Sequence, residues 1–308
     1  MPGQATFPIS RRRWMLGAAS TWLVSRALAD DVPDLELDPE AEAQAIEERA
    51  RKVGLTVFGS VESTNYRVFG NASPVHLKLI LGYCEAVATD FFAYYQGQGF
   101  EVDRPRKKLT ALVFANLRTA AAFLGQKPPS SFGLYDRSAN RFYVFDYRVN
   151  FVAHEAIHQL AYNSGLLQRL RDVPVSISEG IALYGETRKL DAASPPGKLN
   201  NMRLTDLAHV QRKGVAWIPL TRLITDDKLI QGSAGFDTTI LAYAQSWLLV
   251  YYLMKEPDQW ARFRDYLKSI QTRKDPSTRL EDARRHFGDL DLLDKDLRRY
   301  SIRLLKAN

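Results

Sequence analysis

The five residues His154-Glu155-Ala156-Ile157-His158 constrain this chain more than any other stretch of its 308 residues. Histidines at positions i and i+4 project from the same side of an α-helix, one turn apart. Both imidazoles can then reach one metal ion from a single rigid element. Glu155 lies about 100° round the helix from His154, where it can bind a water molecule held by the metal. The stretch therefore predicts a helix, and it is typical of zinc hydrolases in which the glutamate is the general base.

A catalytic zinc ion needs a third protein ligand and an open fourth position, and His₂Glu is one of the known ligand sets. Glu179 lies 21 residues after His158, an interval that fits a helix end, a loop and the start of a second helix. Residues 163–165 (Asn-Ser-Gly) predict the end of the first helix. Pro174 breaks the chain again before the second. We therefore predict that His154, His158 and Glu179 bind Zn²⁺, with water as the fourth ligand.

Two weaker interpretations compete with this site. The H-E-x-x-H pattern can arise by chance in a chain of this size. In addition, Ser176-Ile177-Ser178-Glu179 has the S-x-x-E pattern of a capping box, in which the glutamate only accepts a hydrogen bond from a backbone N–H. A capping box would explain Glu179 but not the two histidines, so the metal site is the stronger hypothesis.

With these residues the chain resembles the gluzincin metallopeptidases, which combine H-E-x-x-H with a glutamate on the next helix. More closely, it is similar to bacterial secreted peptidase MA-like proteins, and the similarity covers most of the chain beyond its N-terminal segment. The segments that carry the similarity, besides the H-E-x-x-H helix, are Phe132–Tyr135, Phe142–Phe145, Ser178–Ala182, Trp217–Leu220 and Tyr243–Trp247. The resemblance implies a gluzincin-like fold, a zinc-dependent peptidase activity and a peptide or protein substrate that pairs with an edge strand.

The chain departs from this pattern at one position. In similar proteins the Glu-Gly-x-Ala segment often continues with a second glutamate, which supports a ligand histidine, and here that residue is Leu183. Glu186, one turn further along, is the candidate substitute. The resemblance also implies that Tyr243, 64 residues after Glu179, donates a hydrogen bond to the oxyanion. The alternative is a tyrosine that simply packs in an apolar helix.

Residues 1–29 are predicted to be an export signal. Residues 10–16 (Ser-Arg-Arg-Arg-Trp-Met-Leu) resemble a twin-arginine motif, and the apolar run at 14–24 is too short for a stable membrane span. Residues 27–29 (Ala-Leu-Ala) form an A-x-A cleavage site. We therefore expect a periplasmic or secreted protein without a stable membrane anchor after cleavage. An uncleaved anchor and ordinary Sec export are the alternatives.

The charge of the chain argues against nucleic acid as a partner. The chain has 42 basic and 35 acidic residues, a formal net charge of +7. Four of the arginines lie in residues 1–29, which contain no acid, so the mature chain keeps 38 basic residues and a net charge of +3. This excess is small for a nucleic-acid-binding protein. The single cysteine, Cys84, excludes an internal disulfide and is predicted to be a core residue.

The order of the expected elements predicts an α+β fold. Residues 30–45 are interpreted as an irregular lead-in. Strands are expected at 55–61, 66–69 and 109–114 and twice between 134 and 145, with helices at 75–95 and 117–124. Helices follow the zinc site at 239–254, 259–270 and 280–305. A small N-terminal sheet with the active-site helix therefore precedes a mainly helical part. We predict an α/β subdomain at 30–165, with the H-E-x-x-H helix, and a mainly helical subdomain at 166–308, with the third ligand.

Three functions remain open at this level: a peptidase, an amidase that acts on cell-wall peptides, and a binding protein that retains a metal but has little turnover. The intact Glu155 argues against the third. Nothing in the sequence separates the first two.

Overall fold

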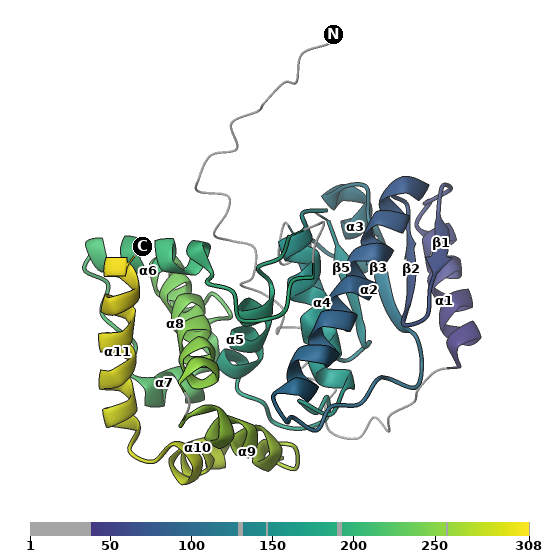
Figure 1. The fold of residues 1–308 in the computed structure, drawn as a ribbon. Coiled ribbons are helices and arrows are strands. Elements are labelled where there is room, and N and C mark those ends of the chain that lie inside the picture. The colour runs from purple at the N-terminus through teal and green to yellow at the C-terminus, as the bar shows by residue number, and fades with distance from the viewer. Residues whose placement is uncertain (1–37, 129–131, 146, 190–192, 257, 308) are drawn as a thin grey trace.

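The computed structural model describes residues 38–128, 132–145, 147–189, 193–256 and 258–307. A sheet comes first in the chain and a mainly helical part follows (Figure 1), which confirms the expected α+β class. The N-terminal elements are α1 (Pro39–Lys52), β1 (Gly59–Glu62), β2 (Tyr66–Gly70), α2 (Pro74–Gly97), β3 (Leu109–Val113), α3 (Leu117–Leu124), β4 (Gly133–Asp136), β5 (Arg141–Val144) and α4 (Val149–Asn163). The later elements are α5 (Val175–Gly185), α6 (Asn201–Arg212), α7 (Leu220–Thr225), η2 (Asp227–Leu229), α8 (Phe236–Lys255), α9 (Trp260–Ile270), η3 (Pro276–Thr278), α10 (Arg279–Phe287) and α11 (Leu290–Ala307).

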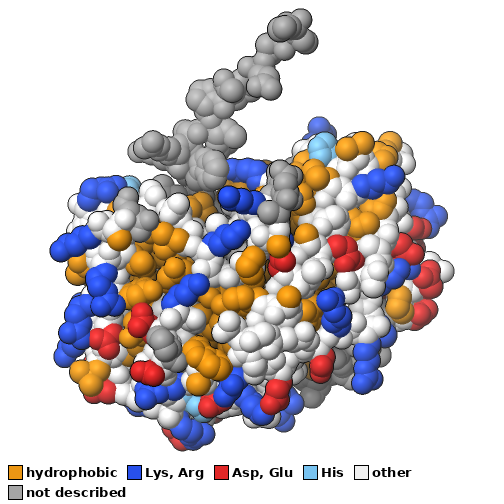
Figure 2. All heavy atoms as spheres, viewed as in Figure 1, with side chains coloured by type: hydrophobic (Ala, Val, Ile, Leu, Met, Phe, Trp, Pro, Cys, Tyr) orange, Lys and Arg blue, Asp and Glu red, His pale blue; other side chains and the backbone are white. Residues whose placement is uncertain are grey.

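The predicted export signal, residues 1–29, lies outside the described residues. Within the described part of the chain, none of the helices has the length and apolar character needed to cross a membrane. Figure 2 shows Lys and Arg side chains spread over the visible face, with Asp and Glu side chains at the edge formed by α1 and β1 and also over the C-terminal helices.

The five strands form one mixed sheet in the order β1-β2-β3-β5-β4. Strands β2, β3 and β5 are parallel to one another, whereas β1 and β4 are antiparallel to their neighbours and lie at the two edges. Every residue of β3 is buried, because both faces of the sheet are covered. Ala111 and Val113 pack on the side of α2 and α4, and Leu112 packs on the side of α1 and α3. This alternation is the period of two that a strand imposes on its side chains.

The expectation of an irregular lead-in at residues 30–45 is wrong for its described part, because α1 begins at Pro39. Acidic residues occupy the first turn of α1 and basic residues the last, which complements the helix dipole. Ile46 and Ala50 are buried against the sheet and give the helix a tertiary partner. The strand expected at 55–61 is also wrong in its bounds, since β1 covers only Gly59–Glu62.

The helix expected at 280–305 is two helices, α10 and α11. Gly288 ends α10 with a φ of 77°, a conformation that favours glycine. The long helix expected at 75–95 is confirmed as α2, whose first turn is capped by the Ser73 side chain. Cys84 on this helix is fully buried, as predicted.

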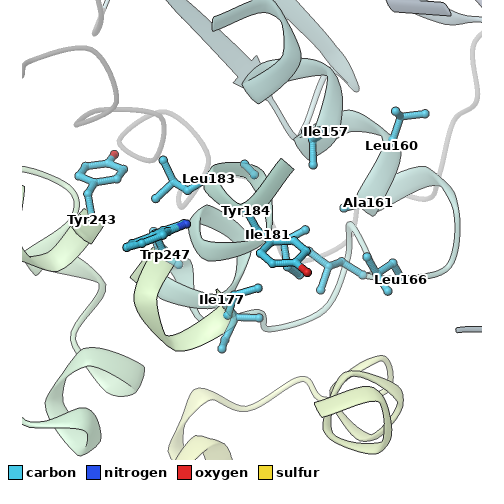
Figure 3. Packing of buried hydrophobic residues seen from close by; sticks show 14 of the residues in the cluster. Ile157, Leu160, Ala161, Leu166, Ile177, Ile181, Leu183, Tyr184, Tyr243 and Trp247 are labelled. Atoms are coloured by element: carbon cyan, nitrogen blue, oxygen red, sulfur yellow. The ribbon is translucent and has the colours of Figure 1, made fainter. Parts of the chain in front are cut away.

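Helix α5 lies at the centre of the apolar packing that joins the sheet to the C-terminal helices. Each of its residues is buried, and it packs between α4 and α8. Figure 3 shows its Ile177, Ile181 and Leu183 among side chains from both neighbours, including Ile157 of α4 and Trp247 of α8. The division of the chain at residue 165 stays a prediction, and the main apolar core contains residues from both sides of it.

Candidate metal site

Helix α4 carries the two histidines of the H-E-x-x-H motif. It begins after Arg148, whose backbone is extended, and ends at Asn163, shortly before Gly165 with a φ of 88°. Its residues from 152 to 162 are all buried, so His154 and His158 are only 7% and 5% exposed. Burial of two polar rings on one helix requires partners for their nitrogens.

Helix α5 carries the third predicted ligand. It begins after Pro174, and the backbone N–H of Val175 donates to Asp227 Oδ1 over 3.1 Å. The N-cap residue is Pro174, which has no capping side chain, and Ser176 and Glu179 both lie within the helix. The capping-box interpretation of Glu179 is therefore wrong.

The structure brings His154, His158 and Glu179 to one point. The two Nε2 atoms of the histidines lie 3.2 Å apart. His154 Nε2 is 3.3 Å from Glu179 Oε2, and His158 Nε2 is 3.5 Å from Glu179 Oε1. Ligands that surround zinc tetrahedrally at about 2.0–2.2 Å lie about 3.4 Å from one another. The two imidazole nitrogens and the two oxygens of Glu179 thus lie at about this spacing, and one ligand atom from each residue falls within 4.8 Å of the others, so this group could hold a metal ion.

The other ring nitrogen of each histidine is held by a residue of, or just after, α5. His154 Nδ1 is 2.9 Å from Glu186 Oε2, and His158 Nδ1 is 3.1 Å from Ser178 Oγ. Such contacts fix the orientation of a ligand histidine and leave its Nε2 for the metal. Glu186 therefore makes the hydrogen-bonding contact with His154 that the apolar side chain of Leu183 cannot make. The contact of Ser178 was not anticipated from the sequence, although its position one residue before Glu179 was a signal for it.

The charges of the site are adapted to a cation. Burial by itself would raise the pKa of Glu179, but His158 and His154 outweigh it and hold that pKa at about 2. Burial by itself would lower the pKa of His154, but hydrogen bonds and charge attraction from Glu179 and Glu186 raise it well above its usual value. The carboxylates therefore stabilise positive charge on the ring even without a metal.

Two buried carboxylate oxygens at this site, Glu155 Oε2 and Glu179 Oε2, have no hydrogen-bond partner among the described residues, and neither has the hydroxyl of Tyr243. Orphaned buried polar atoms are rare in folded proteins, and each calls for an explanation such as an ion or water. A metal ion and its bound water would satisfy both carboxylates. The residues present therefore fit a metal of the kind that His and Glu ligands select.

Glu155 lies against the edge strand β4. A Cβ built on Gly133 would come within 2.8 Å of Glu155 Cγ, so only glycine leaves room for this side chain. Burial raises the pKa of Glu155, although the nearby His154 and His158 and a hydrogen bond from the Tyr135 backbone oppose that shift. The 6% exposed Glu155 is therefore a buried carboxyl beside both the histidines and a sheet edge.

Tyr243 lies on α8 and is 3% exposed. It belongs to the apolar packing around α5 shown in Figure 3. Burial raises the pKa of Tyr243 well above its usual value, and the carboxylates of Glu179 and Glu155 raise it further. Its ring therefore packs as a core residue does, while its hydroxyl lies within the electrostatic reach of the metal site.

A family model described as "Protein of unknown function (DUF1570)" matches residues 148–276. The matched region begins at the residue before α4 and includes both ligand helices, Glu186 and Tyr243, but not the sheet. A search of curated proteins found no significant match. Residues 148–276 are thus similar to a family of unknown function, and the buried His154, His158 and Glu179 group lies inside the matched region.

Proposed function

We propose that this protein is a zinc-dependent peptidase with His154, His158 and Glu179 as the metal ligands. The observation that carries the proposal is the convergence of the two histidine Nε2 atoms and the Glu179 carboxylate, with contacts of 3.2 to 3.5 Å, beside a buried glutamate with a free oxygen. Zinc, when bound, would activate water and polarise the scissile carbonyl as a Lewis acid.

Glu155 is the general base in this proposal. It accepts a proton from the attacking water and passes it to the leaving amine, so it must be both a base and an acid in one cycle. Burial raises its pKa from the usual value for glutamate, which makes the return of the proton easier. Its Oε2 has no partner among the described residues, so it is free to bind that water.

Tyr243 is the proposed donor to the oxyanion. A tetrahedral intermediate carries negative charge on the former carbonyl oxygen, and a preorganised O–H group stabilises it. The raised pKa of Tyr243 keeps its hydroxyl protonated at neutral pH. No described residue binds this hydroxyl in the free protein, so it is available to a substrate.

Strand β4 is the proposed binding site for an extended peptide. It pairs with β5 on one side only, because it lies at the edge of the sheet. The N–H of Phe145 donates to Phe132 O, so by the alternation of an antiparallel ladder the backbone groups of Gly133 and Tyr135 face away from β5. An added strand would pair with the Gly133 groups and the Tyr135 carbonyl, while the Tyr135 N–H stays bonded to Glu155.

The test is zinc content and hydrolysis by the purified chain from residue 30 onward. Mixed peptide libraries and purified peptidoglycan would be offered with and without a chelator. The expected result is about one zinc per chain and chelator-sensitive cleavage of peptides. Cleavage of peptidoglycan stem peptides alone would indicate the amidase, and bound zinc without any hydrolysis would indicate the binding protein. A chain that takes up no zinc, even when zinc is added, would contradict the proposal.

We also propose that the protein works in the periplasm or outside the cell, on the basis of the signal at residues 1–29. N-terminal sequencing of the exported form should find Asp30 as the first residue. Replacement of Arg11 and Arg12 by lysine should block export by the twin-arginine route. Unchanged export of that variant would favour the Sec route.

A further inference from the structure

The support of His154 depends on a glutamate that the helix itself does not fix in place. Glu186 is the residue that follows the last residue of α5, where the helical hydrogen bonds end. Its Oε2 contacts His154 Nδ1, so its orientation decides the orientation of that ring. A side chain at a helix end needs a second contact to hold one rotamer.

Asn200 provides this contact. It is 3% exposed and lies 14 residues after Glu186, at the N-cap of α6. Its Nδ2 donates to Glu186 Oε1 over 2.7 Å and to the backbone oxygen of Leu183 over 3.2 Å. Its Oδ1 accepts from the backbone N–H of Arg203 over 3.3 Å. Both ends of the amide are therefore occupied, and the Asn200 side chain has a single orientation.

Arg203 competes for the same glutamate. Its Nε lies 3.9 Å from Glu186 Oε1, beyond hydrogen-bond distance, and has no hydrogen-bond partner among the described residues. Its Nη1 donates to Asp206 over 2.8 Å, which holds the guanidinium nearby. A Glu186 released from Asn200 would move toward this charge and away from His154, because a charge-assisted hydrogen bond is stronger than a neutral one.

We propose that Asn200 is a positioning residue for the metal site: it holds Glu186 against His154 and thereby sets the affinity of the site for its ion. The proposal rests on the metal site of the proposed function. It also accounts for Leu183, whose backbone oxygen, rather than its side chain, takes part in the support of the histidine.

The decisive variant is Asn200→Asp. Aspartate keeps the size of the side chain and the N-cap acceptor, but it has no N–H to donate to Glu186. Zinc affinity of the metal-free protein would be measured by competition with a chelating indicator, which does not require a substrate. We expect affinity to fall about 10- to 100-fold, the usual effect of losing an outer hydrogen bond to a ligand. The added negative charge alone would strengthen zinc binding, so a loss identifies the lost hydrogen bond.

Asn201→Asp is the matched control, because Asn201 is the next residue, is exposed, and receives the same charge. It should bind zinc as the wild type does. Asn200→Ser keeps a capping oxygen but is too short to reach Glu186, so it should also bind zinc more weakly. This second variant, with thermal unfolding of each metal-free protein, keeps the test valid if Asn200→Asp does not fold.

A double variant, Glu186→Gln with Asn200→Asp, reverses the donor and the acceptor. The introduced glutamine can donate to the introduced aspartate and still accept from His154. It should bind zinc more tightly than Asn200→Asp alone, a coupling that independent sites would not show. Wild-type affinity in folded Asn200→Asp or Asn200→Ser, or a double variant no tighter than Asn200→Asp, would overturn the role of Asn200. A wild-type protein that binds no zinc would contradict the metal site itself.

Discussion

Two of the charged clusters in the described part of the chain, each partly or fully buried, differ in which hydrogen-bonding atoms they leave without a partner. The metal-site cluster consists of His154, Glu155, His158, Glu179 and Glu186. The arginine cluster consists of Asp172, Asp227, Arg273, Arg279 and Asp282. Both lie against α5, the first along the helix and the second where the chain enters it.

The arginine cluster satisfies its own acids. Arg279 binds Asp172 at 2.6 Å and Asp227 at 2.8 Å. Arg273 binds Asp172 at 3.0 Å and Asp282 at 3.1 Å. The orphaned atom in this cluster is a donor, Arg273 Nη2.

The metal-site cluster instead leaves hydrogen-bond acceptors without partners. Glu155 Oε2 and Glu179 Oε2 have no donor among the described residues, although both are buried. A buried group with spare donors needs no cation, whereas one with spare carboxylate oxygens does. Burial of charged side chains therefore does not by itself mark a functional site. The two clusters differ in the kind of atom that remains without a partner: a donor in the arginine cluster and carboxylate acceptors in the metal-site cluster.

The largest expected effect is on turnover, from Glu155→Gln. The variant removes the base but keeps the shape of the side chain, so kcat should fall about 10²- to 10⁴-fold while zinc content stays at the wild-type value. Steady-state hydrolysis and elemental analysis would be measured together. The control is Glu101→Gln, at an exposed glutamate paired with Lys268. Undiminished hydrolysis in Glu155→Gln would remove Glu155 from the mechanism.

The Arg279→Met variant should have the opposite effect, on the stability of the fold and not on the metal site. It removes the shared partner of two half-buried carboxylates, Asp172 and Asp227, although Asp172 keeps Arg273, so the free energy of unfolding should fall by about 3 kcal/mol. Zinc per folded molecule should not change. Arg285→Met on the same helix is the control: its side chain is 59% exposed, and its loss should change stability by no more than about 1 kcal/mol. Loss of zinc at unchanged stability in Arg279→Met would mean that the arginine cluster supports the metal site and not the stability of the fold.

The Tyr243→Phe variant tests whether the Tyr243 hydroxyl acts in catalysis or whether the residue only packs in the core. If the hydroxyl stabilises the oxyanion, kcat should fall about 10²- to 10³-fold with little change in zinc content or thermal stability. Tyr252→Phe makes the same change on α8 where the ring packs against Tyr300 instead. Reduced stability with full activity per folded molecule would make Tyr243 a core residue only.

The smallest expected effect is the shift in stability on removal of zinc. A ligand that binds only the folded state stabilises it by about 2.7 kcal/mol at 100 times its Kd. Thermal unfolding with zinc and with chelator should therefore differ in the wild type. The difference should be much smaller in Glu179→Gln, which lacks the anionic ligand. Arg279→Met should keep the whole difference at its lower melting temperature, and an equal loss there would mean that the clusters are not independent.

The ligands and the fold class could be predicted because their signals are local. Helical periodicity places His154 and His158 on one face, and no tertiary contact is needed for that inference. The order of strands and helices likewise indicated the α+β class. The expectation of irregular chain at residues 30–45 fails because α1 is stabilised by a tertiary contact, the burial of Ile46 and Ala50 against the sheet.

The sequence alone was enough to pick out the residues of the candidate metal site, two histidines on one helix and a glutamate on the next. The hydrogen bonds that hold those residues in place follow from how separate elements pack against one another. Glu186, Ser178 and Asn200 come from a helix end, a helix interior and the cap of a later helix, and no periodicity links them. The physical reason is that a ligand set follows the fixed pitch of a helix. The supporting hydrogen bonds depend on where separate elements come to lie when the core packs, and many different spacings along the chain can satisfy them.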